Sequence, residues 1–225
     1  MKICTLCPRM CAVDRKSGER GICGQTTEIK VARAALHFWE EPCISGEMGS
    51  GAVFFSGCAL HCVFCQNENI ANGTAGKVIS TERLGEIFLE LQEKGANNIN
   101  LVTPGQFVPQ IIKAVELARN QNLKIPIVYN TSSYENVDTI RSLEGIVDIY
   151  LPDFKYFDTA LSAKYSHAPD YPAVAKAVIA EMVRQTGAAV FENGEDSLMK
   201  RGTIVRHLIL PGCTKDSKAV LKYLH

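Results

Sequence analysis

The amino-acid sequence predicts an α/β protein whose core is a parallel β-sheet connected by helices. Short apolar runs of strand length alternate with longer stretches in which apolar residues recur every three or four positions. Successive runs are separated by enough residues for the crossover helix that parallel strands require. With 225 residues, 46% of them hydrophobic, the chain can bury one sizeable core. Together these observations predict βαβ units in one main domain.

Five predicted strands are apolar runs; they are residues 51–57, 97–103, 125–130, 147–152 and 203–210. Four predicted helices have one apolar stripe; they are residues 81–94, 107–121, 134–143 and 172–186. The first helix is the clearest, because it begins with Thr81 as a cap, places Leu84, Phe88 and Leu91 on one face, and ends before Gly95. Chemistry in such sheets is expected at the carboxyl ends of the strands.

Two other segments interrupt this alternation. Residues 28–44 look like an extended lead-in to the first core strand. His37, Glu40 and Glu41 could face a reaction chamber, but we expect a packed histidine and a solvated pair of acids. Residues 187–202 carry the turn dipeptide Asn193-Gly194 and predict a small hairpin. The chain therefore divides into an N-terminal extension with its lead-in, residues 1–45, and a core, residues 46–225.

Three cysteines, Cys58, Cys62 and Cys65, follow the first predicted strand with the spacing C-x3-C-x2-C. Three thiolates hold three irons of a [4Fe–4S] cluster and leave the fourth open, as a catalytic metal site requires. Gly57 lets the backbone turn sharply before them. A zinc knuckle or buried thiols are the alternative, but zinc sites usually combine C-x2-C pairs with a fourth ligand, and no His or Cys follows closely.

A second cysteine group lies at the N-terminus, where Cys4, Cys7, Cys11 and Cys23 have the spacing C-x2-C-x3-C-x11-C. Four thiols suffice for a closed metal site, and so polar a segment needs a metal to supply its folding free energy. Structural zinc, an auxiliary iron–sulfur cluster and free or redox thiols all remain open. We expect the four sulfur atoms to converge on one point.

Composition excludes several classes of partner. The chain has 24 basic and 24 acidic residues and no basic stripe, which argues against nucleic-acid binding. No run approaches the ~20 apolar residues of a membrane span, and the N-terminus lacks a signal-peptide pattern. Nine cysteines in such a chain favour metal ligation in a reducing cytosol over disulfides, and therefore predict a cytoplasmic protein.

Polar residues recur at the ends of the other predicted strands; they are Thr103, Pro104 and Gly105, then Asn130 and Thr131, then Asp153 and Lys155, then Arg206. Polar groups that converge from several strands are typical of a binding site. Taken singly, Asp153 and Lys155 could be an ordinary ion pair, and Thr131 could cap a helix.

The cysteine loop resembles the signature of radical S-adenosylmethionine (SAM) enzymes. Over roughly residues 50–225 the chain is similar to the activating enzymes of glycyl-radical enzymes, the pyruvate formate-lyase activases among them; residues 1–40 match only a subgroup with an extra cysteine-rich N-terminus. The resemblance implies that the reduced cluster cleaves SAM into methionine and a 5′-deoxyadenosyl radical, which takes hydrogen from a protein or peptide. It also implies a flavodoxin- or ferredoxin-like electron donor.

The resemblance also implies roles for individual residues. It makes Cys58, Cys62 and Cys65 the cluster ligands and lays Phe64 against adenine. Asn130 and Thr131 stand where activases carry Asp-Thr, and Asp153 and Lys155 where they carry Asp-x-Lys, whose lysine contacts SAM. Arg206 matches an activase arginine, so Lys155 and Arg206 are the candidate catalytic residues. The change to Asn130 puts a cation site in doubt. The family's Gly-Gly-Glu motif for the SAM amino group is replaced by Thr103, Pro104 and Gly105.

The resemblance further implies a partial (βα) barrel of six strands, whereas five are predicted. A helical stretch begins at Asp216 without a strand after it. We therefore expect a truncated chain, or an exposed edge at residues 203–210 that is covered by a partner or by the N-terminal segment. Two other functions stay open: a radical SAM enzyme that acts on a small molecule, and a non-catalytic module in which both cysteine groups hold zinc.

Overall fold

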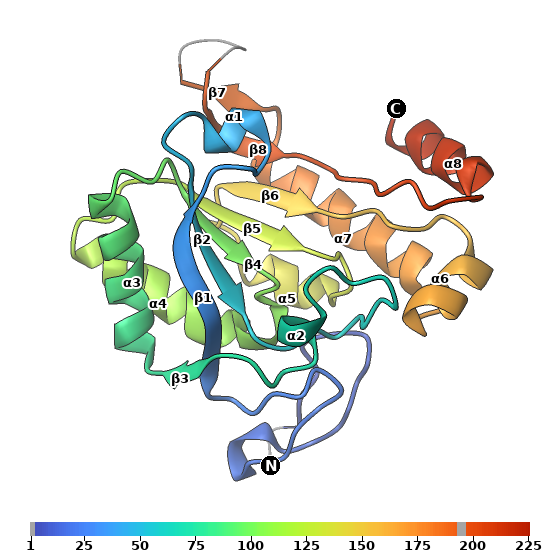
Figure 1. Ribbon diagram of the computed structural model, residues 1–225, viewed down its shortest axis with the longest axis horizontal. Helices are drawn as coiled ribbons and strands as arrows, with labels where there is room; N and C mark the ends of the chain where they lie inside the picture. The colour runs from blue at the N-terminus through green and yellow to red at the C-terminus, as the bar shows by residue number, and fades with distance from the viewer. Residues whose placement is uncertain (1–2, 193–196) are drawn as a thin grey trace.

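The computed structural model describes residues 3–192 and 197–225, and one eight-stranded sheet lies at its centre (Figure 1). The strands follow the order β3-β1-β2-β4-β5-β6-β8-β7. Their bounds are β1 (Ile29–His37), β2 (Ser50–Phe55), β3 (Lys77–Ile79), β4 (Ile99–Val102), β5 (Ile127–Thr131), β6 (Ile149–Pro152), β7 (Val190–Phe191) and β8 (Met199–Thr203). The predicted α/β class is confirmed.

The five strands β2, β4, β5, β6 and β8 are parallel neighbours, as predicted. One row across them joins Val53, Leu101, Tyr129, Tyr150 and Thr203. All but the last of these side chains belong to the main core beneath the helices. Because side chains alternate along a strand, the neighbouring positions point to the concave inner face. The sheet thus has a helix-covered outer face and a separate inner face.

The fifth parallel strand begins earlier than predicted, at Met199 instead of at 203. Beyond Thr203 the chain still runs beside β6, where Ile204 and Arg206 donate backbone hydrogen bonds to Tyr150 and Pro152. It then leaves the sheet, and the apolar residues that suggested a longer strand are largely exposed; they are Leu208 and Ile209. Within the described residues there is no sixth parallel strand.

Three further strands are antiparallel. The expected extended lead-in is β1, which pairs with β2 along most of its length, and β3 pairs with the outer edge of β1. At the opposite edge β7 pairs with β8, so the strands of the predicted hairpin are confirmed, while its Asn193-Gly194 turn lies outside the described residues. The N-terminal segment contacts the loops after β2 and β4. Of the alternatives for residues 203–210, cover by this segment is therefore not the one that the structure has.

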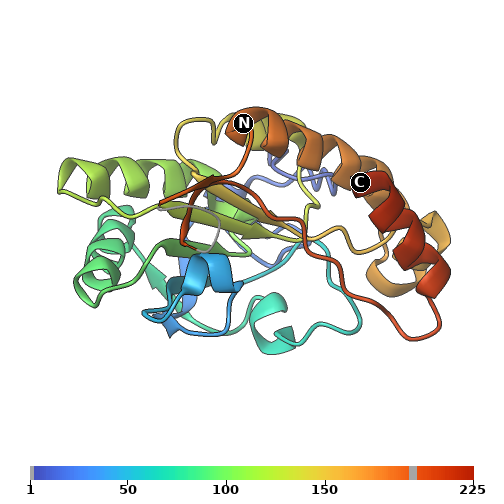
Figure 2. The same ribbon diagram turned by 90° about the horizontal axis from the view of Figure 1, so that it is seen from above.

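The predicted helices correspond to α3 (Thr81–Glu93), α4 (Val108–Asn120), α5 (Val137–Arg141) and α7 (Tyr171–Thr186). The helical stretch predicted from Asp216 is α8 (Thr214–Leu224). Five shorter helices complete the described part of the chain; they are η1 (Arg15–Ser17), α1 (Pro42–Ser45), α2 (Glu68–Ala71), η2 (Gly105–Phe107) and α6 (Thr159–Ser166). The cap of α3 is Ser80, whose hydroxyl accepts from the Arg83 N–H at 3.1 Å, and not Thr81. Figure 2 shows α4 and α7 on one side of the sheet and α1 and α2 on the other.

Helix α1 closes one end of the concave inner face. Ile44 of this helix packs with Val128, Ile149 and Leu151 on the inside of the sheet. Asn98 donates to the Ile44 carbonyl at 2.7 Å, which fixes α1 against the sheet. Burial of side chains of this size contributes about 1.5–3 kcal/mol each. The carboxyl ends of the parallel strands remain at the other end, beside the cysteine loop.

Candidate active site

The cysteine loop leaves β2 through Gly57, whose φ of 88° is in the left-handed region. A Cβ atom at this position would lie 2.3 Å from the carbonyl oxygen of Cys23, because the N-terminal segment packs directly on it. Glycine is therefore required twice, for the turn and for the close approach. Gln106 fastens the same turn by donating to the carbonyls of Ser56 and Gly57, at 2.9 and 3.0 Å.

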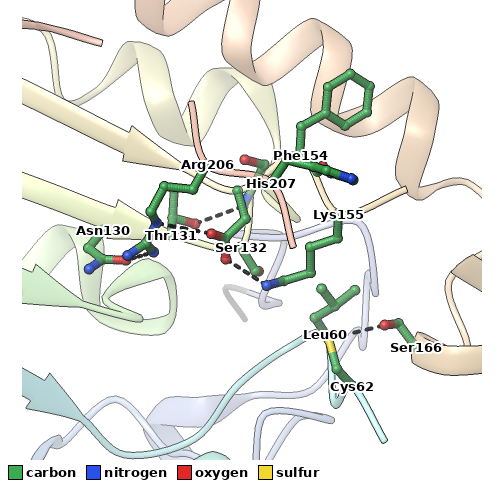
Figure 3. A network of polar contacts seen from close by, with 12 residues as sticks. Leu60, Cys62, Asn130, Thr131, Ser132, Phe154, Lys155, Ser166, Arg206 and His207 are labelled. Carbon is green, nitrogen blue, oxygen red and sulfur yellow. Dashed lines mark hydrogen bonds and ion pairs between the residues drawn. The ribbon is translucent and has the colours of Figure 1, made fainter. Parts of the chain in front are cut away.

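Hydrogen-bond donors surround the thiols of the loop. The Leu60 N–H donates to Cys58 Sγ at 3.4 Å. The Ser166 hydroxyl donates to Cys62 Sγ at 3.1 Å (Figure 3). Desolvation raises the pKa of both thiols, while these donors, together with Lys155 for Cys62, lower it in part. The donors thus favour the thiolate form, which is the form that binds metals.

A cavity of about 650 Å³ opens beside the loop at the carboxyl ends of the strands. We call it the chamber. It is lined by the predicted residues Cys58, Cys62, Phe64, Cys65, Thr103, Asn130, Thr131, Asp153, Lys155 and Arg206. Two predicted residues lie elsewhere: Pro104 precedes η2, and Gly105 lines a second, smaller cavity. Of the three residues that stand in place of the Gly-Gly-Glu motif, only Thr103 therefore faces the chamber. Its φ of 55° is in the left-handed region.

An ion-pair network crosses the chamber (Figure 3). Asp153 accepts from Lys155 Nζ at 2.6 Å and from Arg206 Nε at 3.2 Å. The other guanidinium nitrogens of Arg206 reach Asn130 Oδ1 at 2.6 Å and Glu40 Oε1 at 3.0 Å. Burial favours the neutral form of Lys155, but the neighbouring Asp153 and Cys62 outweigh it, so the pKa of Lys155 is raised. Lys155 therefore carries its charge beside the cysteine loop.

Glu40 belongs to this network, so the expectation that it is solvated is wrong. Its side chain is 11% exposed and accepts from Asn100 Nδ2 at 2.6 Å, Asn130 Nδ2 at 3.2 Å and Arg206. Asn100 and Asn130 lie on the inner face of β4 and β5. Glu40 reaches them because β1 runs antiparallel to β2 and delivers the following loop beneath the sheet. His37 and Glu41 line the chamber as well.

Tyrosines hold the other chamber residues in place. The Tyr171 hydroxyl accepts from the Lys155 N–H at 2.9 Å and lies 3.0 Å from the Ser132 carbonyl, which joins the ends of β5 and β6. Phe64 packs edge-on against Tyr156 and Tyr165, with both ring centroids 6.3 Å away. These contacts fix the ring of Phe64 at the chamber wall.

The hydroxyl of Thr131 forms its hydrogen bonds with residues that do not line the chamber. It donates to the buried carboxylate of Glu135, which also accepts from the Tyr129 hydroxyl at 2.5 Å. Desolvation raises the pKa of Glu135, and these two donors lower it in part. The hydroxyl also accepts from the Ser133 N–H at 3.1 Å, so it shapes the turn after β5 and does not cap a helix.

The N-terminal cysteines Cys4, Cys7, Cys11 and Cys23 all line the smaller cavity, of about 30 Å³, which we call the thiol cavity. Desolvation raises the pKa of Cys7 to about 12, and the other three thiols add to the rise. Among the described residues, no three His, Cys, Asp or Glu side chains are grouped tightly enough to hold a single metal ion. This applies to both cysteine groups alike, so it does not distinguish zinc from an iron–sulfur cluster at either of them.

Cys58 connects the two sites, because it lines both the chamber and the thiol cavity. Three other residues also line both cavities; they are Thr103, Thr131 and Ser132. The sequence gives no signal of this common wall, since the two cysteine groups are far apart in the chain. None of the helices in the described part of the chain is both long and apolar enough to cross a membrane.

Comparison with known proteins agrees with this geometry. Residues 52–222 match the family described as the radical SAM superfamily. The chain is also 27% identical over 217 residues to an uncharacterized protein of Methanocaldococcus jannaschii, a match that covers 93% of this chain and 57% of the relative. Three thiols on one loop, open to a chamber, are a donor set that fits a [4Fe–4S] cluster with one free iron. The chain belongs to the radical SAM superfamily, whose members bind a [4Fe–4S] cluster and SAM.

Proposed function

We propose that this radical SAM enzyme takes a hydrogen atom from a protein or peptide, as activating enzymes do. The observation that carries the proposal is that three cysteine thiols and the network of Asp153, Lys155 and Arg206 face one chamber. A cluster bound there supplies one-electron cleavage of SAM. The protein's own groups orient that reaction and keep water from it.

Each of these groups has a specific task in the proposal. Cys58, Cys62 and Cys65 hold the cluster. The ammonium group of Lys155 suits the SAM carboxylate, and Asp153 keeps it aimed into the chamber at 2.6 Å. Phe64 offers an aromatic face for adenine. Arg206 is engaged by three oxygen atoms of its neighbours, so its task is to hold Asn130 and Asp153 in position.

Two features support a polypeptide substrate. One is the resemblance to activating enzymes along most of the core. The other is the chamber mouth, where Trp39 is 89% exposed and Leu208 is 52% exposed, although both line the chamber. Exposed apolar side chains around an opening are typical of surfaces that bind another chain. The same proposal includes a flavodoxin- or ferredoxin-like electron donor and a cytosolic location. It also includes a metal centre at the N-terminal cysteines, which is either zinc or a second cluster.

The chain spans 57% of the length of the M. jannaschii relative, so the activity of the whole protein is part of the proposal. The test uses deuterium. Cells of the source organism are grown in deuterated medium, and their extract is divided into a macromolecular and a low-mass fraction. Each fraction is incubated anaerobically with reconstituted protein, unlabelled SAM and dithionite, and 5′-deoxyadenosine is examined by mass spectrometry.

Deuterium in 5′-deoxyadenosine from the macromolecular fraction is the expected result, and protease treatment of that fraction should abolish it. Label from the low-mass fraction alone would overturn the polypeptide substrate in favour of a small molecule. A reconstituted protein that binds zinc at both cysteine groups and takes up no iron would overturn the enzymatic function as well.

A further inference from the structure

We propose that Cys4, Cys7, Cys11 and Cys23 hold a second iron–sulfur cluster. It passes electrons to the cluster that cleaves SAM, which we call the radical cluster and which is bound by the cysteine loop of Cys58, Cys62 and Cys65, the radical loop. The proposal rests on the proposed function only in that the radical cluster needs one electron for each SAM. Its structural basis is the N-terminal segment, residues 3–28, and the way in which this segment is attached to the core.

The N-terminal segment folds without an apolar core. None of its described residues belongs to any of the three hydrophobic clusters of the protein. Met10 and Ala12, on either side of Cys11, have left-handed φ values of 42° and 55°. Residues other than glycine keep such a conformation only where the surroundings demand it. A metal centre bound by all four thiols would provide that demand.

The four thiols line one cavity although their residues do not follow one another. All of them line the thiol cavity, and Cys11 Sγ accepts from the Ile22 N–H at 3.3 Å. Gly21 leaves room for this thiol, since a Cβ atom there would lie 3.2 Å from Cys11 Sγ. Four thiolates are the complete ligand set of a [4Fe–4S] cluster. The segment can therefore close its own site without a ligand from the core.

The position favours a cluster over zinc. Cys58 of the radical loop lines the thiol cavity together with the four N-terminal cysteines. Zinc has no redox chemistry, whereas iron–sulfur clusters take up and release electrons. A metal centre at this position can therefore supply electrons to the radical cluster only if it contains iron.

The attachment of the segment places its cavity directly behind the radical loop. Arg9 donates from Nε to the Ala59 carbonyl at 2.9 Å and from Nη2 to the Leu60 carbonyl at 3.4 Å. His61 Nε2 lies 2.9 Å from the Ile22 carbonyl oxygen. The Cys58 side of the loop is shared by both cavities. An electron that leaves the second cluster therefore meets the radical loop first.

The outer side of the segment is open to a donor. Met10 and Ile22, each next to one of the four cysteines, are 55% and 51% exposed. A reduced flavodoxin-type protein that docks there would give one electron to the second cluster. That cluster would pass it to the radical cluster, where the cleavage of SAM consumes it. The donor is oxidised by one electron for each SAM that is cleaved.

The first test counts metal. The anaerobically reconstituted wild-type chain should contain about eight iron and eight sulfide ions, four of each per cluster. The variant Cys7→Ser/Cys11→Ser should lose half of both, as should the triple variant Cys58→Ala/Cys62→Ala/Cys65→Ala. Cys43→Ser and Cys213→Ser, which change isolated thiols, are the controls and should keep all of them. Thermal unfolding of each variant shows whether it is folded.

The second test compares reductants. SAM cleavage is measured with reduced flavodoxin and, separately, with dithionite, which is small enough to reach either cluster. The ratio of the flavodoxin-driven to the dithionite-driven rate should fall at least about tenfold in Cys7→Ser/Cys11→Ser, and it should not change in Cys213→Ser. A ratio is used because it cancels any general loss of activity.

Two results would overturn the proposal. One is a wild-type protein with about four iron ions, whether the N-terminal thiols then hold zinc or nothing. The other is an unchanged reductant ratio in a Cys7→Ser/Cys11→Ser protein that has lost half of its iron, which would show a second cluster without a role in electron supply. Neither result bears on the substrate, so the proposed function stands or falls separately.

Discussion

Arg206 donates to Glu40 across 3.0 Å and so joins two parts of the chain that are 166 residues apart. Glu40 comes from the loop beneath the sheet, and Arg206 follows the last parallel strand. Their contact completes a chain of charges that continues through Asp153 to Lys155 beside the cysteine loop. Glu40 is therefore connected through hydrogen bonds and ion pairs to Lys155, the residue that binds the SAM carboxylate in the proposal.

The first prediction concerns this contact. Glu40→Gln removes the charge that Arg206 and two asparagine amides share. We expect unfolding in urea to show a loss of roughly 1.5–3 kcal/mol, the range for hydrogen bonds to charged groups. We also expect weaker SAM binding, because Arg206 positions Asn130 and Asp153. Glu41→Gln removes the same charge one residue away, and an equal effect of both variants would contradict the role of the contact.

The second prediction concerns Lys155. Lys155→Met keeps the length of the side chain and removes its charge, so SAM binding should weaken about tenfold, which corresponds to about 1.4 kcal/mol. Iron content should be unchanged, because the thiols are untouched. Equilibrium dialysis with labelled SAM measures the first and a colorimetric iron assay the second. Lys164→Met is the control on a nearby helix. Unchanged SAM affinity would reduce Lys155 and Asp153 to a structural ion pair.

The third prediction tests the ligands of the radical cluster. Cys62→Ala should abolish the formation of 5′-deoxyadenosine, because two thiolates do not hold the cluster in a defined place. Ser166→Ala removes only the hydroxyl that donates to Cys62 Sγ at 3.1 Å. It should keep the iron and change the potential of the cluster, which electron paramagnetic resonance during a redox titration measures. A Cys62→Ala protein that still cleaves SAM would contradict the assignment.

The sequence allowed good prediction where one local pattern decides the outcome. The five parallel strands and the Cys58 loop after the first of them follow from apolar runs and cysteine spacing, and the structure has them in that order. The antiparallel pairing of β1 was missed because alternating strands of either direction have the same pattern. Helix α6 was missed because it has no clear apolar face and because four of its eight residues have weak helix propensity.

Contacts between distant segments could not be predicted. Glu40 is followed by another acid and by Pro42, which reads as a solvated turn. Its burial depends on the direction of β1 and on Asn100, whose side chain lies on the inner face of the sheet. No local sequence pattern predicts that an asparagine is placed there. The wall shared by the chamber and the thiol cavity is of the same kind, because it depends on how Arg9 attaches the N-terminal segment to the loop.

The last prediction separates two reasons for a glycine. Gly57 and Gly18 have similar left-handed φ values, 88° and 95°. A Cβ atom at Gly18 would meet nothing within 4 Å, whereas one at Gly57 would lie 2.3 Å from the Cys23 carbonyl and 2.7 Å from Cγ of Gln25. Gly18→Ala should therefore cost only the conformational strain, about 1–2 kcal/mol. Gly57→Ala has to push the N-terminal segment away as well, and should cost at least about 3 kcal/mol.

Urea unfolding measures both losses, and limited proteolysis shows where the chain opens. Gly57→Ala should be cleaved within residues 3–28 at a protease concentration that leaves Gly18→Ala intact, because only the first substitution separates this segment from the radical loop. Gly57→Ala should also lose iron from the radical loop more readily, since Cys58 is the next residue. Equal unfolding free energies for the two variants would show that the segment is not held against Gly57, and that its cavity does not share a wall with the chamber.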